Sequence, residues 1–283
     1  MIAILGGLGA AVAWALSTLC SSRSSRLIAP LSVVAWVMLV GLVVAAPPAA
    51  LDGIPRALHG STLVWFVLAG AGNVIGLVLT YHALRLGQVA LVSPLVSTEG
   101  AIAAVIAIVA GESLAPGVGV TLGLIAAGVC LASVSRPAVA AEDAYRHPVV
   151  VALAAAAALA FGASLYATGR AGTSLPASWV ALSARLFGVV ALTLPLALRG
   201  RLQLTRRAAK LVAASGVAEV VGFYSYTLGS RHGIAVAAVL SSQFGALSLL
   251  GAYVLFGERL TRLQLTGVAG VIVGVAVLSG LRA

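Results

Sequence analysis

Long apolar stretches run through the whole chain, separated by short segments that hold most of the polar and charged residues. A transmembrane helix needs about 20 mainly apolar residues. The stretches of that kind are Ile2–Cys20, Leu27–Ala46, Ser61–Leu84, Val89–Ala110, Gly117–Ser135, Pro148–Ala167, Leu175–Leu198, Ala209–Leu228, Gly233–Phe256 and Leu263–Leu281. No segment shows the alternating pattern of a membrane β-strand. The pattern therefore predicts an all-α polytopic membrane protein with ten transmembrane helices.

Composition supports lipid as the main solvent of this chain. Of its 283 residues, 61% are hydrophobic and only 8% are charged, whereas a soluble domain carries about 25% charged residues. A soluble globular domain, a disordered chain and a disulfide-knit secreted module are excluded. The net charge of +10 lies between the apolar stretches, where Arg and Lys set membrane topology and contact anionic lipid. We therefore expect the lipid bilayer, and not nucleic acid, as the partner of these basic residues.

The chain also contains an internal repeat. A shift of 146 residues places Gly111–Leu114 on Gly257–Leu260, and a shift of 147 places Trp14 on Phe161. The repeat predicts two five-helix domains, residues 1–135 and 148–283, with a linker loop at residues 136–147. Because five is odd, the second copy enters the membrane from the opposite side. Such inverted repeats are typical of secondary transporters, which bind substrate near the midplane between the copies.

These features resemble the EamA type of the drug/metabolite transporter superfamily. The resemblance rests on five plus five helices, the aromatic residue with small neighbours at Trp14 and Phe161, and the Gly-Glu-x-Leu turns. Its most specific part is Phe256–Thr261, followed by Gln264 and Gly267. It covers essentially the whole chain and implies a carrier of small metabolites or drugs in the plasma (inner) membrane, usually an exporter. Relatives carry amino acids, amines, sugars, nucleotide derivatives or toxic cations, so the substrate stays open, as does a homodimer.

The orientation in the membrane is open as well. If the ten spans are correct, the odd-numbered loops carry twelve basic residues, and the even-numbered loops and termini carry four. Basic residues favour the cytoplasmic side, which would place both termini outside. The resemblance instead implies that both termini are cytoplasmic.

Three charged residues, Glu99, Arg185 and Glu219, fall at the centres of the fourth, seventh and eighth spans. A charge at this depth costs about 2.5–3.5 kcal/mol even on the lenient insertion scale. One explanation is a purely structural ion pair. The other is a transport site, because burial favours the protonated form of a carboxyl group and a nearby Arg favours the ionised form. Glu219 is our first candidate for loading and releasing a proton.

Neighbouring polar and aromatic positions extend this candidate site. Asn73 is the repeat partner of Glu219, and Tyr226 lies two helical turns from Glu219. Gln243 and Ser97 are repeat partners near the middle of the ninth and fourth spans. The predicted site for substrate and proton consists of Glu219, Glu99, Arg185, Asn73, Gln243, Tyr226, Trp14 and Ser97. Aromatic rings beside a carboxylate suit an organic cation, Arg suits a carboxylate or phosphate, and both signs together suit a zwitterion.

Local patterns predict bends, caps and close helix contacts. Pro94 interrupts the fourth span. Gly72 and Gly76 form a small-xxx-small face for close helix packing. Glu112 and Glu258, at the two Gly-Glu turns, are predicted to act as helix caps or interface ion pairs.

Two other classes of function, a membrane-embedded enzyme and an uncoupled channel, compete with a transporter. A membrane-embedded enzyme would need a catalytic cluster, yet the sequence has no H-E-x-x-H motif, and its four His residues lie in loops or at span ends. No Walker A motif precedes Lys210. An uncoupled facilitator or channel would need a continuous polar pore. We expect no enzyme activity, cofactor or metal, and predict proton-coupled export of a small organic metabolite by alternating access.

Overall fold

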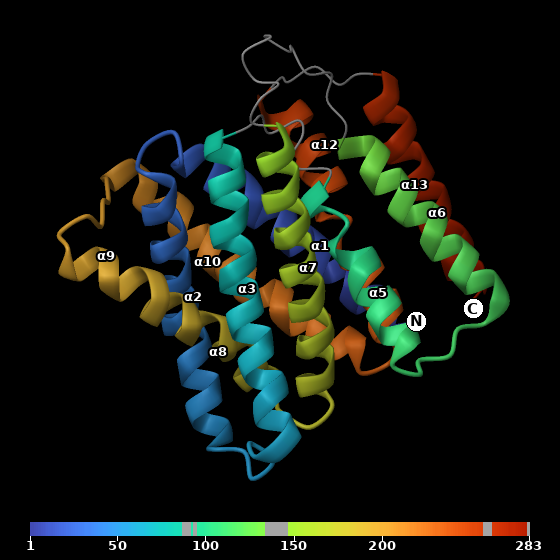
Figure 1. Ribbon diagram of the computed structural model, residues 1–283, viewed down its shortest axis with the longest axis horizontal. Helices are drawn as coiled ribbons and strands as arrows, with labels where there is room; N and C mark the ends of the chain where they lie inside the picture. The colour runs from blue at the N-terminus through green and yellow to red at the C-terminus, as the bar shows by residue number, and fades with distance from the viewer. Residues whose placement is uncertain (87–91, 93–94, 134–146, 257–261, 282–283) are drawn as a thin grey trace.

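The computed structural model describes residues 1–86, 92, 95–133, 147–256 and 262–281, and every regular element in these ranges is a helix (Figure 1). Seven helical segments are long and apolar enough to cross a membrane, and three shorter apolar helices accompany them. Each of these ten segments overlaps a different predicted span, which agrees with the ten-helix prediction. Most of the predicted linker, residues 136–147, lies outside the described residues.

The helices follow the predicted spans closely, and several extend beyond them by a turn. They are α1 (Ile2–Ser24), α2 (Pro30–Asp52), α3 (Gly60–Leu86), α5 (Glu99–Val109), α6 (Pro116–Ser133), α7 (His147–Gly172), α8 (Ala177–Gly188), the π-helical turn η2 (Val189–Thr193), α9 (Leu194–Leu198), α10 (Arg206–Ser230), α11 (Ile234–Ser241), α12 (Phe244–Phe256) and α13 (Arg262–Leu281). The seventh span thus consists of α8, η2 and α9. Pro195 in α9 lacks the N–H that would continue the regular pattern, and a widened turn precedes it.

The predicted ninth span, Gly233–Phe256, contains the candidate membrane span Ile234–Leu255, and a turn interrupts its helix. A turn at Ser242 and Gln243 separates α11 from α12. The Ser242 hydroxyl and the Gln243 side-chain amide both donate to the Val239 carbonyl, at 2.8 and 2.9 Å, so side chains satisfy a backbone acceptor at the break. A turn at Ser97 and Thr98 likewise precedes α5. Pro94, predicted to interrupt the fourth span, lies outside the described residues.

The helices pack in a regular set of pairs. Contacts join α1 to α10, α3 to α7, α2 to α8, α5 to α11 and α6 to α13; the last pair lies side by side at the right of Figure 1. Small residues allow several of these contacts. A Cβ at Gly72 would lie 3.0 Å from the Ala160 carbonyl oxygen of α7. One at Gly76 would collide with the Phe161 ring. The predicted small-residue face on α3 is therefore confirmed.

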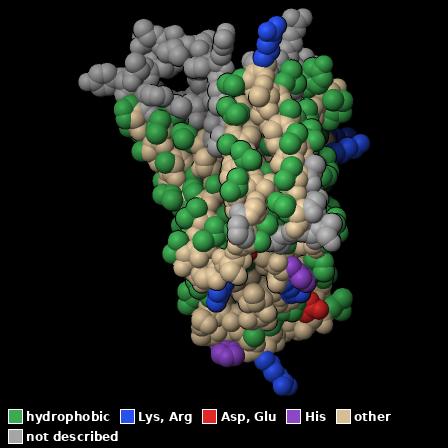
Figure 2. Space-filling model, turned by 90° about the vertical axis from the view of Figure 1, so that its right-hand side faces the viewer, with side chains coloured by type: hydrophobic (Ala, Val, Ile, Leu, Met, Phe, Trp, Pro, Cys, Tyr) green, Lys and Arg blue, Asp and Glu red, His purple; other side chains and the backbone are tan. Residues whose placement is uncertain are grey.

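The outer surface is apolar, as a lipid-facing surface requires. Large hydrophobic side chains such as Val43, Leu51 and Ile272 are well exposed, although the chain buries many alanines and glycines between its helices. Figure 2 shows hydrophobic side chains over much of one face, while charged side chains lie mainly toward its ends. Buried charge is consequently conspicuous in this fold, and among the described residues it occurs at one cavity.

Candidate transport site

A cavity of about 260 Å³ lies between helices of the first and second halves of the chain. Its wall extends from the middle of the helices toward the end at which α1 finishes and α2 begins. The lining residues are Trp14, Ser17, Thr18, Ser21, Val34, Val37, Met38, Asn73, Leu77, Thr80, Val96, Glu99, Phe161, Ser164, Leu165, Glu219, Phe223 and Phe244. Among the residues that the structure describes, this wall contains two carboxylates and no Lys, Arg or His.

Glu219 of α10 forms an ion pair with Arg185 of α8. The Arg185 Nη2 atom lies 3.2 Å from Glu219 Oε2, and the Arg185 side chain is fully buried whereas the Glu219 side chain is 24% exposed. Arg185 Nη1 also contacts the Met38 sulfur at 3.4 Å, and the guanidinium carbon lies 4.9 Å from the Phe223 ring centroid. A guanidinium at this depth gains from both the carboxylate and the aromatic ring. Arg185 thus sits behind the cavity wall and balances the charge of Glu219.

A chain of hydroxyl groups supports the second oxygen of the Glu219 carboxylate. Ser17 of α1 donates to Glu219 Oε1 at 3.0 Å and shares a 2.8 Å hydrogen bond with Ser215. Ser215 and Ser21 are also 2.8 Å apart. Because hydroxyl groups can donate or accept as required, this chain can reorganise when the carboxylate gains or loses a proton. It leads from Glu219 along α1 toward the end of that helix.

Glu99 and Asn73 lie elsewhere on the cavity wall and have unused hydrogen-bonding capacity. Glu99 is the first residue of α5 and is 7% exposed, and no described residue forms a hydrogen bond or ion pair with its carboxylate. The Asn73 side-chain oxygen is buried without a partner. Gly162 of α7 lets α5 come close, since a Cβ there would lie 3.0 Å from the Glu99 carbonyl oxygen. An unpaired polar group at such a position is costly unless a ligand satisfies it.

Four aromatic rings complete the wall. The Trp14 and Phe223 ring centroids are 5.4 Å apart in an edge-to-face arrangement, and Phe244 lies 6.4 Å from Trp14. Phe161 lines the cavity from α7. The Trp14 ring packs directly against Gly222, because a Cβ at position 222 would collide with the indole ring. The cavity is therefore mostly apolar, with a few polar groups at fixed positions, as is typical of small-molecule sites.

Many wall residues occur as repeat-related pairs. The shift of 147 relates Trp14 to Phe161, Ser17 to Ser164 and Thr18 to Leu165, and the shift of 146 relates Asn73 to Glu219 and Leu77 to Phe223. Both members of each pair line the same cavity. The cavity thus receives equivalent positions from each half of the chain.

The structure brings together some of the predicted site residues and not others. Glu219, Glu99, Asn73 and Trp14 line the cavity, and Arg185 lies directly behind it. The other three are buried but are not part of the wall: Tyr226, Gln243 and Ser97. The Tyr226 hydroxyl donates to the Leu165 carbonyl at 2.9 Å, so it is engaged in helix packing.

Several wall residues were missed at the sequence level. Phe161 could have been found as the repeat partner of Trp14, and Phe223 lies one helical turn beyond Glu219. Phe244 follows the break between α11 and α12, which no sequence signal predicted. Phe244 is the first residue of α12 after this turn, and its side chain lines the cavity.

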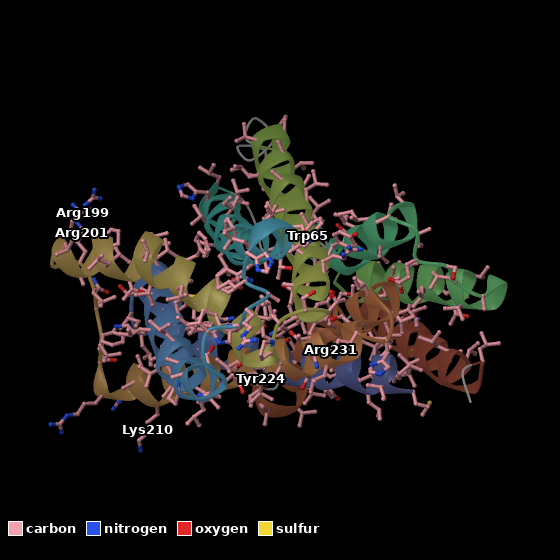
Figure 3. All side chains as sticks on the ribbon, turned by 90° about the horizontal axis from the view of Figure 1, so that it is seen from below. Trp65, Arg199, Arg201, Lys210, Tyr224 and Arg231 are labelled. Carbon is pink, nitrogen blue, oxygen red and sulfur yellow. The ribbon has the colours of Figure 1, made fainter. Side chains whose placement is uncertain are left out.

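The opposite end of the helices is closed by specific contacts. Arg231, after α10, donates to the carbonyl oxygens of Gly172 and Leu175 at 2.7 and 2.9 Å. Figure 3 shows Arg231 among the helices, whereas Arg199 and Arg201 extend at the periphery.

A glutamate provides a second contact at the closed end. The Glu112 carboxylate accepts the backbone N–H groups of Ile234 and Ala235, at 3.0 and 3.2 Å, and thereby caps α11. This bears out the cap predicted for Glu112, while Glu258 lies outside the described residues.

The described residues contain no group of three or more His, Cys, Asp or Glu side chains that could hold a metal ion. No curated protein sequence matches this chain. A solved crystal structure of another protein is similar in fold, with a TM-score of 0.81 at 22% identity over 99% of this chain and 96% of that chain.

Apolar helical segments packed around a mostly apolar cavity with a few polar groups agree with a multi-pass membrane transporter. The profile of the EamA-like transporter family matches residues 1–134 and again residues 149–280. The chain belongs to the EamA-like transporter family, whose members are transporters of the drug/metabolite superfamily.

Proposed function

We propose that this protein is a secondary active transporter that exports a small organic metabolite or drug across the plasma (inner) membrane in exchange for protons. The observation that carries this proposal is the Glu219–Arg185 ion pair at the edge of the central cavity. A carboxylate that faces a cavity on one side and a buried cation on the other can bind a proton or a substrate. Binding of either a proton or a substrate by the Glu219 carboxylate weakens its ion pair with Arg185.

The proposed mechanism links protonation to helix movement. When Glu219 is ionised, Arg185 holds α8 against α10 through the 3.2 Å contact. When Glu219 accepts a proton, Arg185 loses its counter-ion and keeps only the Met38 sulfur and the Phe223 ring as neighbours. An uncompensated buried charge is strongly unfavourable. Protonation therefore favours a different packing of α8 and α10, which gives the coupling its physical basis.

Alternating access is supported by the two ends of the bundle. The cavity wall includes Ser21 near the end of α1 and Val34 near the start of α2, so it extends toward one end. At the other end, Arg231 ties α10 to the α7–α8 connection. A transporter that exposes one central site to each side in turn needs such an asymmetric arrangement and its reverse.

We further propose that the two halves, residues 1–135 and 148–283 with the linker 136–147 between them, are inverted five-helix repeats. The helix pairing supports this. In the two halves, α1 corresponds to α7 and α10 corresponds to α3. The α1–α10 contact therefore corresponds to the α7–α3 contact, and both contacts are extensive. The pairs α2–α8, α5–α11 and α6–α13 join equivalent spans of the two halves. In this arrangement, the state open to the other side of the membrane forms when each half of the chain adopts the conformation that the other half had.

The proposal is tested with Glu219→Gln in proteoliposomes that carry a pH gradient. We expect the variant to insert and fold with reduced stability, because Arg185 loses its counter-ion. It should lose pH-driven substrate flux, because Gln cannot release a proton. Asp52→Asn is the matched control, since the Asp52 carboxylate accepts a hydrogen bond from Ser178 and does not line the cavity. Undiminished proton-coupled flux in Glu219→Gln would overturn the proposal. Flux without any pH dependence in the unmodified protein would favour a facilitator.

A further inference from the structure

We infer that the cavity selects organic cations, and specifically molecules that join a protonated amine to an apolar or aromatic body. This inference rests on the proposed transport function and assigns a ligand class to the same cavity. Four observations carry it: the position of Arg185, the state of Glu99, the acceptor on Asn73 and the aromatic wall.

The only buried Arg among the described residues is withdrawn from the ligand. Arg185 is fully buried and is not part of the cavity wall. Its guanidinium is held by Glu219, the Met38 sulfur and the Phe223 ring. Gly41 of α2 makes room for its stem, since a Cβ there would lie 2.7 Å from Arg185 Cδ. A substrate carboxylate or phosphate in the cavity therefore meets no Lys, Arg or His among the described wall residues.

The described part of the wall offers two acidic side chains and no basic one. One of its two carboxylates, Glu219, is already balanced by Arg185 and by the Ser17 hydroxyl. The other, Glu99, is more than nine-tenths buried and has no partner among the described residues, although it lines the cavity. An ionised carboxylate at this depth requires a positive charge beside it. A ligand cation in the cavity supplies that charge.

Two other wall atoms are buried without a partner, the Asn73 side-chain oxygen and the Trp14 indole N–H, and the oxygen bears on the kind of cation. The Asn73 side-chain oxygen is a buried acceptor without a donor. Together with the Glu99 carboxylate, it offers acceptors to a group with several N–H bonds, and a primary ammonium has three donors. A quaternary ammonium has none. We therefore expect the cavity to prefer a primary amine over its trimethylated analogue.

The apolar part of the ligand fits the rest of the wall. Trp14, Phe161, Phe223 and Phe244 surround a space that is mostly apolar. Aromatic rings attract a desolvated cation through their faces and provide apolar area for the ligand body. A simple inorganic cation would use neither property. Phenethylamine is thus a suitable probe for the predicted chemistry.

The test uses isothermal titration calorimetry on the full-length protein in detergent at one fixed pH. The probes share one phenethyl body: phenethylamine, its N,N,N-trimethyl analogue, phenethyl alcohol, 3-phenylpropionate and phenylalanine. We expect phenethylamine to bind about tenfold or more tightly than the alcohol and the trimethyl analogue, and 3-phenylpropionate not to bind. Tighter binding of 3-phenylpropionate or phenylalanine, or no binding by any probe, would overturn the inference.

Variants separate the cavity charge from the fold. Glu99→Gln keeps the size of the side chain and should weaken phenethylamine binding by about tenfold or more while leaving alcohol binding unchanged. Asn73→Leu should narrow the preference for the primary amine over the trimethyl analogue. Asp52→Asn should bind phenethylamine like the unmodified protein. Unchanged phenethylamine affinity in a folded Glu99→Gln variant contradicts the role of Glu99.

Parallel flux measurements keep this inference distinct from the proposed function. Glu219-dependent, pH-driven flux of phenylpropionate would overturn the cation selectivity but leave proton-coupled transport intact. Glu99-dependent binding of phenethylamine without any pH-driven flux would support the cation selectivity and overturn proton-coupled transport. The two failures therefore have different signatures.

Discussion

The two halves of the cavity wall use equivalent positions for different purposes. In one half, the Ser17 hydroxyl donates to the Glu219 carboxylate across the α1–α10 contact at 3.0 Å. In the other half, the equivalent Ser164 donates to the Ala69 backbone carbonyl across the α7–α3 contact at 2.7 Å. Asn73 stands where Glu219 does, and its oxygen has no partner. The α1–α10 side of the wall thus contains an ion-paired carboxylate, whereas the α7–α3 side has a packing hydrogen bond and a neutral amide at the equivalent positions.

The charged groups of the site are asymmetric, although the aromatic rings and the glycines that pack against them are related by the repeat. The glycines that seat the two aromatic rings are repeat partners, Gly222 for Trp14 and Gly76 for Phe161. The charges, by contrast, are not duplicated. The apolar frame of the cavity is therefore regular between the two groups of helices, whereas its charged groups are asymmetric.

The ionic half is expected to show the largest effect on stability. Arg185→Met should lower the free energy of unfolding by about 3 kcal/mol, because it leaves the Glu219 carboxylate without its counter-ion. The double variant Arg185→Met/Glu219→Gln should recover most of this loss. Unfolding by SDS in mixed micelles measures both. Equal losses in the single and double variants would show that the pair does not act as a unit.

The shared frame is expected to respond equally on both sides. Gly76→Ala and Gly222→Ala should each destabilise the protein by about 1–3 kcal/mol, because the new methyl group displaces the Phe161 or Trp14 ring. Gly123→Ala in α6 is the control, since a Cβ there meets no atom within 4 Å. Thermal unfolding in detergent gives the ranking. A large loss of stability in only one of the two variants would show that the two glycine–aromatic contacts are not equivalent.

The serine pair provides the smallest and most discriminating difference. Ser17→Ala and Ser164→Ala should each reduce stability by about 0.6 kcal/mol, the average for hydrogen bonds between membrane helices. Only Ser17→Ala should also reduce pH-driven flux, because only Ser17 contacts Glu219. Flux assays of both variants at matched protein density decide this. Equal flux losses would assign the serines a common structural role.

Much of the fold could be read from the sequence, because lipid imposes a simple rule on chain segments. The ten spans follow from the length of each apolar stretch. The breaks before α5 and within the ninth span could not be read in this way. Ser242 and Gln243 bond to the Val239 carbonyl at the break, and such bonds leave no trace in hydropathy.

The candidate site was predicted in part for a similar reason. The ion pair of Arg185 and Glu219 was signalled by the high cost of charge at the midplane. Tyr226 shares a helix face with Glu219, but it lies two turns nearer the closed end. There Gly229 brings α10 against Gly6 of α1. Whether a side chain faces a cavity or a neighbouring helix depends on where helices converge, which one helix cannot reveal.

The contact between Met38 and Arg185 joins the same repeat position of the two halves, since the residues are 147 apart. A self-paired dimer of the first half would place thioether against thioether there and contain no ion pair. A self-paired dimer of the second half would press two guanidinium groups together in an apolar helix contact. The charged centre is therefore a property of the fused chain: it exists because one gene product carries two unlike copies, and neither copy alone reproduces it.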